Sequence, residues 1–256
     1  MDGVLWHGDT PLPGLAAFFD TLRQKGIAFV LATNNSGRTP EQYLEKLARM
    51  GVQASHDEIL TSAQATALYL AEHTPNGARV FVIGEDGIRN ALTERGYTLC
   101  DLYEDGAQYV VVGMDRGLTW DKLATATLNI RAGAKFIGTN GDTSFPSERG
   151  IIHGNGAILA ALTTATGVPP VVIGKPEPIM YQQALARLGG TSEDTWGLGD
   201  RLETDILGAI RAGIPSILVL SGITSQADVT ANSDYQPNLV LPGIAELTGL
   251  LQATIP

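Results

Sequence analysis

Short, continuous apolar runs alternate along this chain with stretches in which apolar residues recur every three or four positions. The continuous runs lie at residues 27–32, 79–84, 109–113, 135–139, 171–174, 216–220 and 239–241. Helical spacing covers residues 15–22, 88–95, 120–132, 157–166, 181–188, 206–212 and 244–251. Continuous apolar runs are typical of strands buried on both faces of a parallel sheet. The alternation therefore predicts an α/β fold with parallel strands.

Composition restricts the classes of partner. The 256 residues carry a net charge of −10, and no window is rich in Lys or Arg, which argues against a nucleic-acid or anionic-membrane partner. No apolar run approaches the length of a membrane-spanning helix. Cys100 is the only cysteine, so an internal disulfide is excluded and a reducing, cytoplasmic location is expected.

Polar residues follow two of the predicted strands directly. Residues 33–38 (TNNSGR) come after the strand at 27–32 and offer hydroxyl, amide and backbone N–H donors to an oxyanion. A solvated turn before a helix is the alternative, since residues 39–42 (TPEQ) form a capping box. Lys175 follows the strand at 171–174 and is held by two nearby prolines; the alternative for it is a surface lysine in a proline-rich loop.

Two acids flank the start of a later helix. Asp200 follows a short apolar run with two glycines, and Asp205 comes five positions later. At the carboxyl edge of an open α/β sheet, two such acids suit a hard cation such as magnesium. Alternatively, Asp200 is a turn residue and Asp205 an acid favoured by the helix dipole. The residues themselves leave both interpretations open.

Four stretches occur in an order similar to that of the haloacid dehalogenase (HAD) superfamily. They are residues 2–6 (DGVLW), 31–36 (LATNNS), 174–176 (GKP) and 199–205 (GDRLETD). More narrowly, the chain resembles subfamily IIA, the NagD-like or 4-nitrophenylphosphatase-type phosphatases. That branch is favoured by residues 82–85, 136–145 and 218–225. The resemblance covers essentially the whole chain.

The resemblance implies a three-layer Rossmann-like core with a parallel sheet and an inserted α/β cap. The core would comprise residues 1–61 and 169–256, and the cap residues 62–168. It also implies Mg²⁺-dependent hydrolysis of small-molecule phosphate monoesters through an aspartyl-phosphate. The partner would be a small phosphorylated metabolite, and the resemblance allows a homodimer formed through the cap.

The resemblance also implies roles for individual residues. Asp2 would be the general acid and base and would hold the metal together with Asp200 and Asp205. Lys175 would be a catalytic, charge-neutralising and phosphate-binding residue. The other expected phosphate- or substrate-binding residues are Thr33, Asn34, Asn35, Asn140 and Asp142. The loop at residues 221–225 is expected to line the approach together with Asn140 and Asp142.

One part of the family pattern lies outside this sequence. The nucleophilic Asp is expected immediately before Met1, after an apolar strand that would occupy the middle of the core sheet. We therefore expect the natural protein to extend upstream of Met1. The alternative is a non-catalytic phosphate-binding or regulatory protein without the nucleophile. A phosphotransferase on the same machinery is a third interpretation, and the sequence leaves the ester open among phosphoglycolate, nucleoside monophosphates, sugar phosphates and aryl phosphates.

Overall fold

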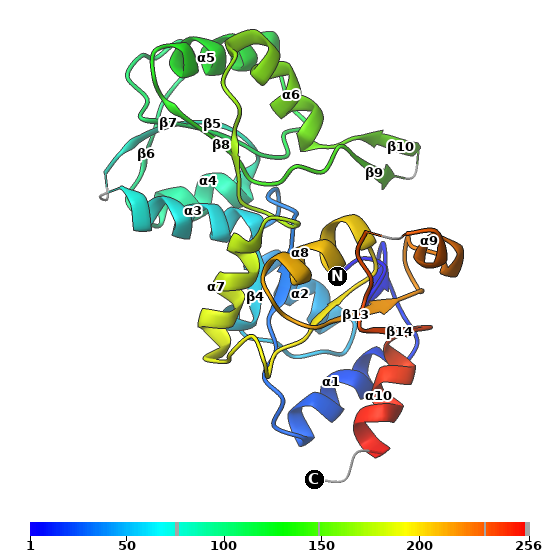
Figure 1. Cartoon of the computed structure of the whole chain (residues 1–256). Coiled ribbons are helices and arrows are strands. Elements are labelled where there is room, and N and C mark those ends of the chain that lie inside the picture. The colour runs from blue at the N-terminus through cyan, green and yellow to red at the C-terminus, as the bar shows by residue number, and fades with distance from the viewer. Residues whose placement is uncertain (75–76, 148, 233, 254–256) are drawn as a thin grey trace. The chain divides into compact units, whose positions relative to one another are not determined.

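The computed structural model describes residues 1–74, 77–147, 149–232 and 234–253. The chain forms two compact units, each built from more than one segment (Figure 1). Unit 1 comprises Met1–Ala32, Glu41–Leu60 and Lys175–Pro256, and unit 2 comprises Thr33–Pro40 and Thr61–Gly174. The assignment of these parts to a core and a cap stays a prediction.

The described strands of unit 1 form three small sheets. They are β1 (Trp6–His7), β2 (Thr10–Pro11), β3 (Leu31–Thr33), β4 (Ile59–Thr61), β12 (Gly197–Gly199), β13 (Ser216–Val219) and β14 (Leu239–Leu241). β12, β13 and β14 are parallel and neighbours in that order, β3 pairs with β4, and β1 and β2 form an antiparallel hairpin. β12 ends one residue before Asp200, so the parallel sheet positions that acid at its carboxyl edge.

The helices of unit 1 pack an aromatic and aliphatic core around these strands. They are α1 (Leu15–Gln24), α2 (Pro40–Arg49), α7 (Pro178–Leu188), α8 (Leu207–Arg211), α9 (Gln226–Ala231) and α10 (Ile244–Ala253), with the short helical turns η1 (His56–Glu58) and η2 (Leu202–Ile206). α1 packs against α10 (Figure 1). Phe18 and Phe19 of α1 are buried in the core. The amphipathic spacing of α1 explains this, because its apolar residues share one face.

A buried lysine ties α2 to the β1–β2 hairpin. Lys46 is only 4% exposed; its Nζ donates to the carbonyl oxygen of Gly8 at 2.5 Å and lies 4.6 Å from the centre of the Trp6 ring. A cation over an aromatic face is attracted to it, and the carbonyl satisfies one of the buried N–H donors. The segment that follows Asp2 is thereby held against α2.

Unit 2 contains a parallel five-stranded sheet, in the order β11-β8-β7-β5-β6 among the residues described. Its strands are β5 (Arg79–Ile83), β6 (Thr98–Leu99), β7 (Tyr109–Val112), β8 (Lys135–Gly138) and β11 (Val171–Val172), and β9 (Ser144–Ser147) and β10 (Gly150–His153) form a separate antiparallel hairpin. β5, β7 and β8 are buried on both faces, as their continuous apolar sequences predict.

Helices lie on both faces of that sheet (Figure 1). They are α3 (Ser62–His73), α4 (Asp86–Thr93), α5 (Trp120–Arg131) and α6 (Asn155–Thr166). α5 packs on α6, and α3 on α4. α3 begins at a capping box: the backbone N–H of Gln64 donates to Thr61 Oγ1 at 3.1 Å, and the Gln64 side chain accepts from the Thr61 N–H at 3.0 Å.

The structure differs from the sequence-based prediction in several elements. The buried strand predicted at residues 27–32 is observed only at Leu31–Thr33 and is half-buried, because its free edge has no partner strand within the described residues. The β1–β2 hairpin forms at residues 6–11, where the sequence pattern predicts no strand. The run at 171–174 forms the two-residue β11, which pairs with β8 of unit 2. The helix predicted at 206–212 is observed as η2 followed by α8.

Candidate active site

Asp200 is buried beneath two glycine-containing segments of unit 1. It is 5% exposed, and its Oδ2 accepts a hydrogen bond from the backbone N–H of Ile223 at 3.0 Å. A Cβ atom added to Gly3 or Gly222 would lie 2.5 Å or 2.1 Å from that oxygen, closer than real side chains approach. Ser221 Oγ donates to the Gly3 carbonyl at 2.7 Å and joins the two segments. Asp200 therefore occupies a cradle that only glycine at both positions permits.

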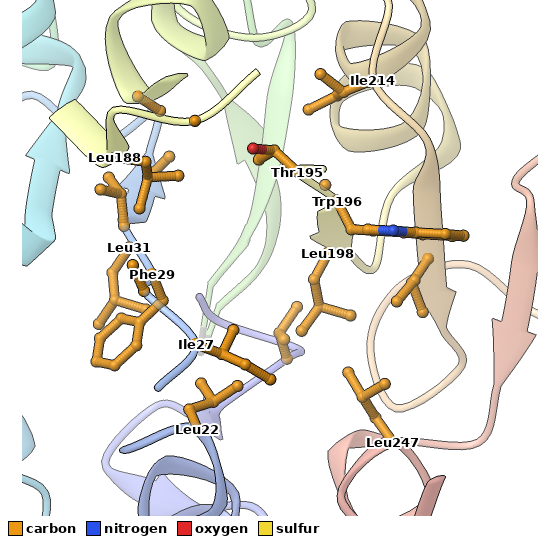
Figure 2. A pocket seen from close by; sticks show the side chains of 18 of the residues that line it. Leu22, Ile27, Phe29, Leu31, Leu188, Thr195, Trp196, Leu198, Ile214 and Leu247 are labelled. Carbon is orange, nitrogen blue, oxygen red and sulfur yellow. The ribbon is translucent and has the colours of Figure 1, made fainter. Parts of the chain in front are cut away.

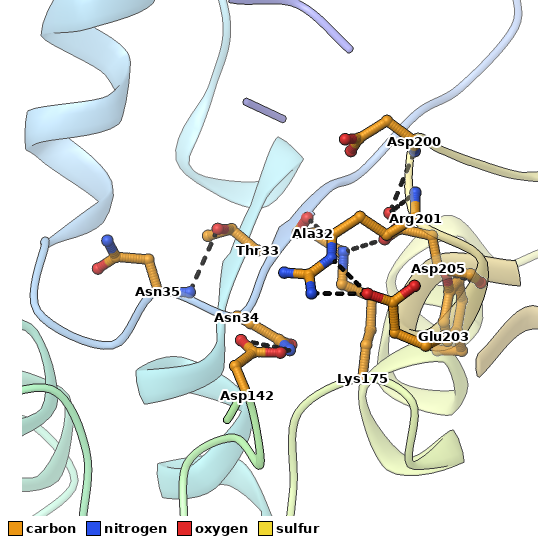
Figure 3. Close-up of polar contacts among 11 residues, drawn as sticks. Ala32, Thr33, Asn34, Asn35, Asp142, Lys175, Asp200, Arg201, Glu203 and Asp205 are labelled. Carbon is orange, nitrogen blue, oxygen red and sulfur yellow. Dashed lines mark hydrogen bonds and ion pairs between the residues drawn. The ribbon is translucent and has the colours of Figure 1, made fainter. Parts of the chain in front are cut away.

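Lys175 and Asp205 form a buried ion pair beside Asp200 (Figure 3). Lys175 Nζ donates to Asp205 Oδ1 at 2.7 Å, and it lies 3.4 Å from the carbonyl oxygen of Ala32. The other carboxylate oxygen of Asp205 accepts from the backbone N–H groups of Asp200 at 3.2 Å and Arg201 at 3.1 Å. Lys175 thus meets Asp205 and the neighbouring Asp200 at one place, although it lies 30 positions before Asp205 along the chain.

The two carboxylates of this cluster are in opposite electrostatic situations. Burial, followed by the negative charge of Asp205, raises the pKa of Asp200. Burial also pushes the pKa of Asp205 upward. The positive charge of Lys175 and the hydrogen bonds that Asp205 receives outweigh this effect, so the pKa of Asp205 is lowered. The site therefore holds one carboxylate paired with a cation and a second, adjacent one whose charge is unfavourable in the protein alone.

Tyr181 supports this cluster, although its sequence context has an ordinary core interpretation. Its hydroxyl donates to the backbone carbonyl of Asp205 at 2.8 Å, and the residue is 8% exposed. Burial and the nearby Asp205 charge raise the pKa of Tyr181 well above its ordinary value, so the hydroxyl stays protonated and remains a donor. Local sequence offers no signal for this contact, because the two residues are brought together only by folding.

The Asp2 side chain does not join the buried cluster. It is 69% exposed, and its Oδ1 lies 3.9 Å from His7 Nδ1. The backbone that follows it is in place, since Gly3 packs against Asp200. The structure therefore brings the Asp2–Gly3 backbone to the predicted site, while the carboxylate lies in solvent beside His7.

The predicted phosphate- and substrate-binding residues Asn34, Asn140 and Asp142 form a polar cluster in unit 2. The Asn34 side-chain amide donates to both carboxylate oxygens of Asp142 at 3.3 and 3.2 Å (Figure 3). Asn140 Nδ2 and Ser62 Oγ both donate to the Asn34 backbone carbonyl, at 2.9 and 2.7 Å. Asn34 is thus held through its side chain and its backbone.

Thr33 and Asn35 shape the turn that leads to α2. The backbone N–H of Asn35 donates to Thr33 Oγ1 at 3.3 Å. Asn35 Oδ1 accepts from the N–H groups of Gly37 at 2.9 Å and Arg38 at 3.2 Å. This Asx-type turn matches the turn interpretation of residues 33–38. The Asn35 side-chain oxygen is thus engaged by the backbone, and a role of Asn35 in binding phosphate stays a prediction.

The predicted site residues fall into two groups. Asp2, Lys175, Asp200 and Asp205 belong to unit 1, and Thr33, Asn34, Asn35, Asn140 and Asp142 belong to unit 2. The chain joins the groups directly at two points, because Thr33 follows Ala32 and Lys175 follows Gly174. A single shared phosphate pocket stays a prediction. Sequence reasoning missed the roles of Gly3 and Gly222. The available signal was that Gly3 directly follows the site acid Asp2 and that Gly222 lies in the loop after β13.

The described residues offer few side-chain donors to a metal ion at this site. Across the described ranges, no group of three or more His, Cys, Asp and Glu side chains is close enough to hold a metal. Asp200 nevertheless supplies a hard carboxylate oxygen in a glycine cradle. A cation beside this oxygen would offset the two effects that raise the pKa of Asp200, which are its burial and the negative charge of Asp205. Asp200 together with backbone carbonyl oxygens therefore fits Mg²⁺ better than a soft metal.

Comparisons with known proteins identify the family. The family profile of haloacid dehalogenase-like hydrolases matches residues 1–98, and a second HAD-hydrolase-like profile matches residues 172–247. An acid sugar phosphatase from Staphylococcus saprophyticus is 44% identical over 233 residues, covering 91% of this chain and 89% of the relative. No helix in the described parts is long and apolar enough to cross a membrane.

Two solved structures agree with this result. A 4-nitrophenylphosphatase from Thermotoga maritima has a TM-score of 0.93 and 33% identity, covering 98% of this chain and 95% of that one. A glycerol phosphate phosphatase from Mycobacterium tuberculosis in complex with magnesium has a TM-score of 0.89 and 35% identity, covering 98% and 76%. The chain belongs to the haloacid dehalogenase-like hydrolases and has their α/β fold. Within them it is a phosphatase of the NagD-like subfamily IIA.

Proposed function

We propose that this phosphatase hydrolyses small phosphate monoesters with Mg²⁺, through an aspartyl-phosphate formed on an aspartate immediately before Met1. A carboxylate oxygen of that aspartate attacks phosphorus, the ester P–O bond breaks, and the leaving oxygen takes the proton of the Asp2 carboxylic acid. Water then attacks the phosphorus of the aspartyl-phosphate. Asp2 takes a proton from this water, so that inorganic phosphate leaves and both aspartates return to their first state.

The buried cluster of Lys175, Asp205 and Asp200 is the observation that supports this proposal. Phosphoryl transfer depends mainly on positioning and on neutralising oxygen charge. Asp205 fixes the Lys175 ammonium at 2.7 Å, so the lysine is a rigid positive charge rather than a mobile one. A mere surface lysine would have no reason to be buried with a carboxylate partner.

Asp200 and the Asp2 backbone carbonyl would hold the metal, with Asp205 orienting the surrounding backbone. When bound, Mg²⁺ would supply charge neutralisation for the phosphoryl oxygens. For Asp2 to act as acid and base, its side chain must leave the solvent-exposed position beside His7 and turn to the substrate. Substrate binding through Asn34 and Asp142 of unit 2 is the remaining part of the proposal.

A phosphate-release assay on three proteins tests the proposal. The chain is compared with two versions extended upstream by the same apolar segment, one ending in Asp and the other in Asn before Met1. A panel of sugar, glycerol, nucleoside and aryl phosphates also determines the ester class. We expect Mg²⁺-dependent turnover only for the Asp version, abolished by EDTA and restored by Mg²⁺.

The Asn version is the matched control, because it keeps the size and hydrogen-bonding capacity of the residue without its nucleophilic charge. Equal turnover by the Asp and Asn versions, or full turnover by the 256-residue chain, would contradict the proposed nucleophile. Mass spectrometry of an acid-quenched reaction should detect the added phosphoryl group only in the Asp version. A cytoplasmic location and a homodimer stay predictions.

A further inference from the structure

Helix α6 of unit 2 begins with the sequence GNG at residues 154–156, and this short motif lies against the stretch that contains Asp142. The backbone N–H of Gly156 donates to the Asp142 carbonyl oxygen at 2.8 Å. A Cβ atom added to Gly154 would lie 2.1 Å from that oxygen, and one added to Gly156 would lie 2.5 Å from the Gly141 carbonyl oxygen. Glycine at both positions therefore allows the start of α6 to approach this stretch so closely.

Asn155, between the two glycines, is a buried amide that joins two backbone carbonyls. It is 7% exposed, and its Nδ2 donates to the carbonyl oxygens of Asn140 at 2.9 Å and Val112 at 3.1 Å. Its Oδ1 is buried as well and has no hydrogen-bond partner within the described residues. Leaving a buried acceptor without a bond is unfavourable, so this side chain stabilises its surroundings only through its two donors.

These contacts connect Asn155 to the polar cluster around Asn34. The Asn140 side chain accepts the backbone N–H of Asp142 at 3.2 Å and donates to the Asn34 carbonyl oxygen at 2.9 Å. Asp142 is thus held at its N–H through Asn140 and at its carbonyl by Gly156. Because the backbone is fixed on both sides, the Asp142 carboxylate stays beside the Asn34 amide, which donates to both of its oxygens.

We propose that Asn155 is a positioning residue, which orients Asp142 to accept a hydrogen bond from a hydroxyl group of the leaving alcohol. This proposal rests on the assignment of Asp142 to substrate binding under the proposed function, and it narrows the substrate to esters whose alcohol carries further hydroxyl groups. An ionised carboxylate only accepts hydrogen bonds, so a hydroxyl donor on the substrate matches it. A site built to bind a substrate hydroxyl discriminates strongly against an analogue that lacks it.

Unit 1 also contains a groove, but it offers mainly apolar contacts. The groove has a volume of about 810 Å³ and is lined mostly by aliphatic and aromatic side chains, among them Leu22, Leu31 and Leu198 (Figure 2). Apolar contacts are non-directional and do not favour an alcohol with hydroxyl groups over one without them. A preference for the hydroxylated ester therefore reports on polar groups such as those of the cluster in unit 2.

The test compares the binding of glycerol 3-phosphate and propyl phosphate, which share a three-carbon alcohol and differ only in its further hydroxyl groups. Dissociation constants for the 256-residue chain are measured by NMR titration in the presence of Mg²⁺, so the result does not depend on turnover. We expect the unsubstituted chain to bind glycerol 3-phosphate more tightly, and Asn155→Ala to reduce this preference roughly tenfold. Asn155→Ser, whose hydroxyl can still donate to one carbonyl, should reduce it less.

Asn129→Ala is the matched control, because Asn129 makes the same kind of contacts elsewhere in unit 2. Asn129 is 3% exposed, and its Nδ2 donates to the carbonyl oxygens of Glu104 and Thr125, both at 3.1 Å. Its Oδ1 accepts the backbone N–H of Ala107, also at 3.1 Å. We expect Asn129→Ala to lower the Tm at least as much as Asn155→Ala does, while leaving the binding preference unchanged.

Three results would overturn the proposal. They are equal or absent binding of the two esters by the unsubstituted chain, an unchanged preference in Asn155→Ala, and the same loss of preference in Asn129→Ala. If Asn155→Ala does not fold, Asn155→Ser decides by the same comparison. A phosphate-release assay separates this proposal from the proposed function: a preference that Asn155→Ala loses, in a protein that turns over no ester, would refute the reaction and support the positioning role.

Discussion

Neutralising Asp205 by the substitution Asp205→Asn is the most direct test of the buried cluster. The side chains of Lys175 and Asp205 are only 11% and 9% exposed, and 2.7 Å separates their charged atoms. Asn keeps the shape and can still accept a backbone N–H, but it leaves the Lys175 ammonium without its charged partner. Breaking a buried ion pair by removing one partner costs about 3–5 kcal/mol. At roughly 2–4 °C per kcal/mol, the expected fall in Tm is about 6–20 °C.

The matched control is Glu203→Gln, two residues away in the same turn. Glu203 pairs with Arg201 at 2.7 Å as well, but its side chain is 52% exposed. Solvent screens an exposed pair, so its loss should cost no more than about 1 kcal/mol. Because the two ion pairs have the same N···O distance but differ in burial, comparing the two variants isolates the effect of desolvation. Removing both charges, as Lys175→Met with Asp205→Leu, should recover much of the stability lost in the single variant.

The assays are thermal unfolding, which gives the Tm, and urea unfolding, both at pH 7 in EDTA so that no bound cation replaces the missing charge. Trp120 is the tryptophan of unit 2, whereas Trp6 and Trp196 belong to unit 1. Trp120 is 83% exposed, so Trp120→Phe makes a tolerant background in which fluorescence reports on unit 1 alone. If Asp205→Asn shifts the midpoint no more than Glu203→Gln does, at the same m-value, the pair contributes no special stability and the reasoning fails.

Three further predictions concern other contacts. Gly222→Ala brings a Cβ to 2.1 Å from Asp200 Oδ2, so it should raise the Mg²⁺ concentration for half-maximal activity, measured by titration of the active enzyme. Asp142→Ala should reorder the substrate panel while leaving that Mg²⁺ concentration unchanged; the reverse result would contradict its assignment to substrate binding. Burial acts to raise the pKa of Glu58, but the hydrogen bond from Arg23 outweighs it, so the pKa of Glu58 is lowered. The pair therefore stabilises the fold fully above the unfolded pKa of about 4.3, and the effect of Arg23→Gln on the urea midpoint should decline below that pH and disappear as the pH falls through the lowered pKa of folded Glu58.

Local signals in the sequence sufficed to predict most of unit 2. β5, β7 and β8 are continuous apolar runs, and a strand buried on both faces requires such a run whatever its neighbours are. α3 begins at its capping box because that motif closes its hydrogen bonds within four residues. The order of the short polar motifs along the chain was likewise enough to indicate the family, which the comparisons confirm.

Contacts between distant residues decided the rest. Residues 27–30 have the composition of a strand but do not form one, because a strand also requires a neighbour to accept its backbone hydrogen bonds. Lys175 and Asp205 lie 30 positions apart, and the Ser221–Gly3 contact spans 218, so no local pattern could reveal either. The sequence by itself determined which residues could do this chemistry. Only the tertiary structure decided that Lys175 and Asp205 form a buried ion pair and that the Asp2 carboxylate lies in solvent. Desolvation and hydrogen bonding depend on which groups folding brings next to each side chain.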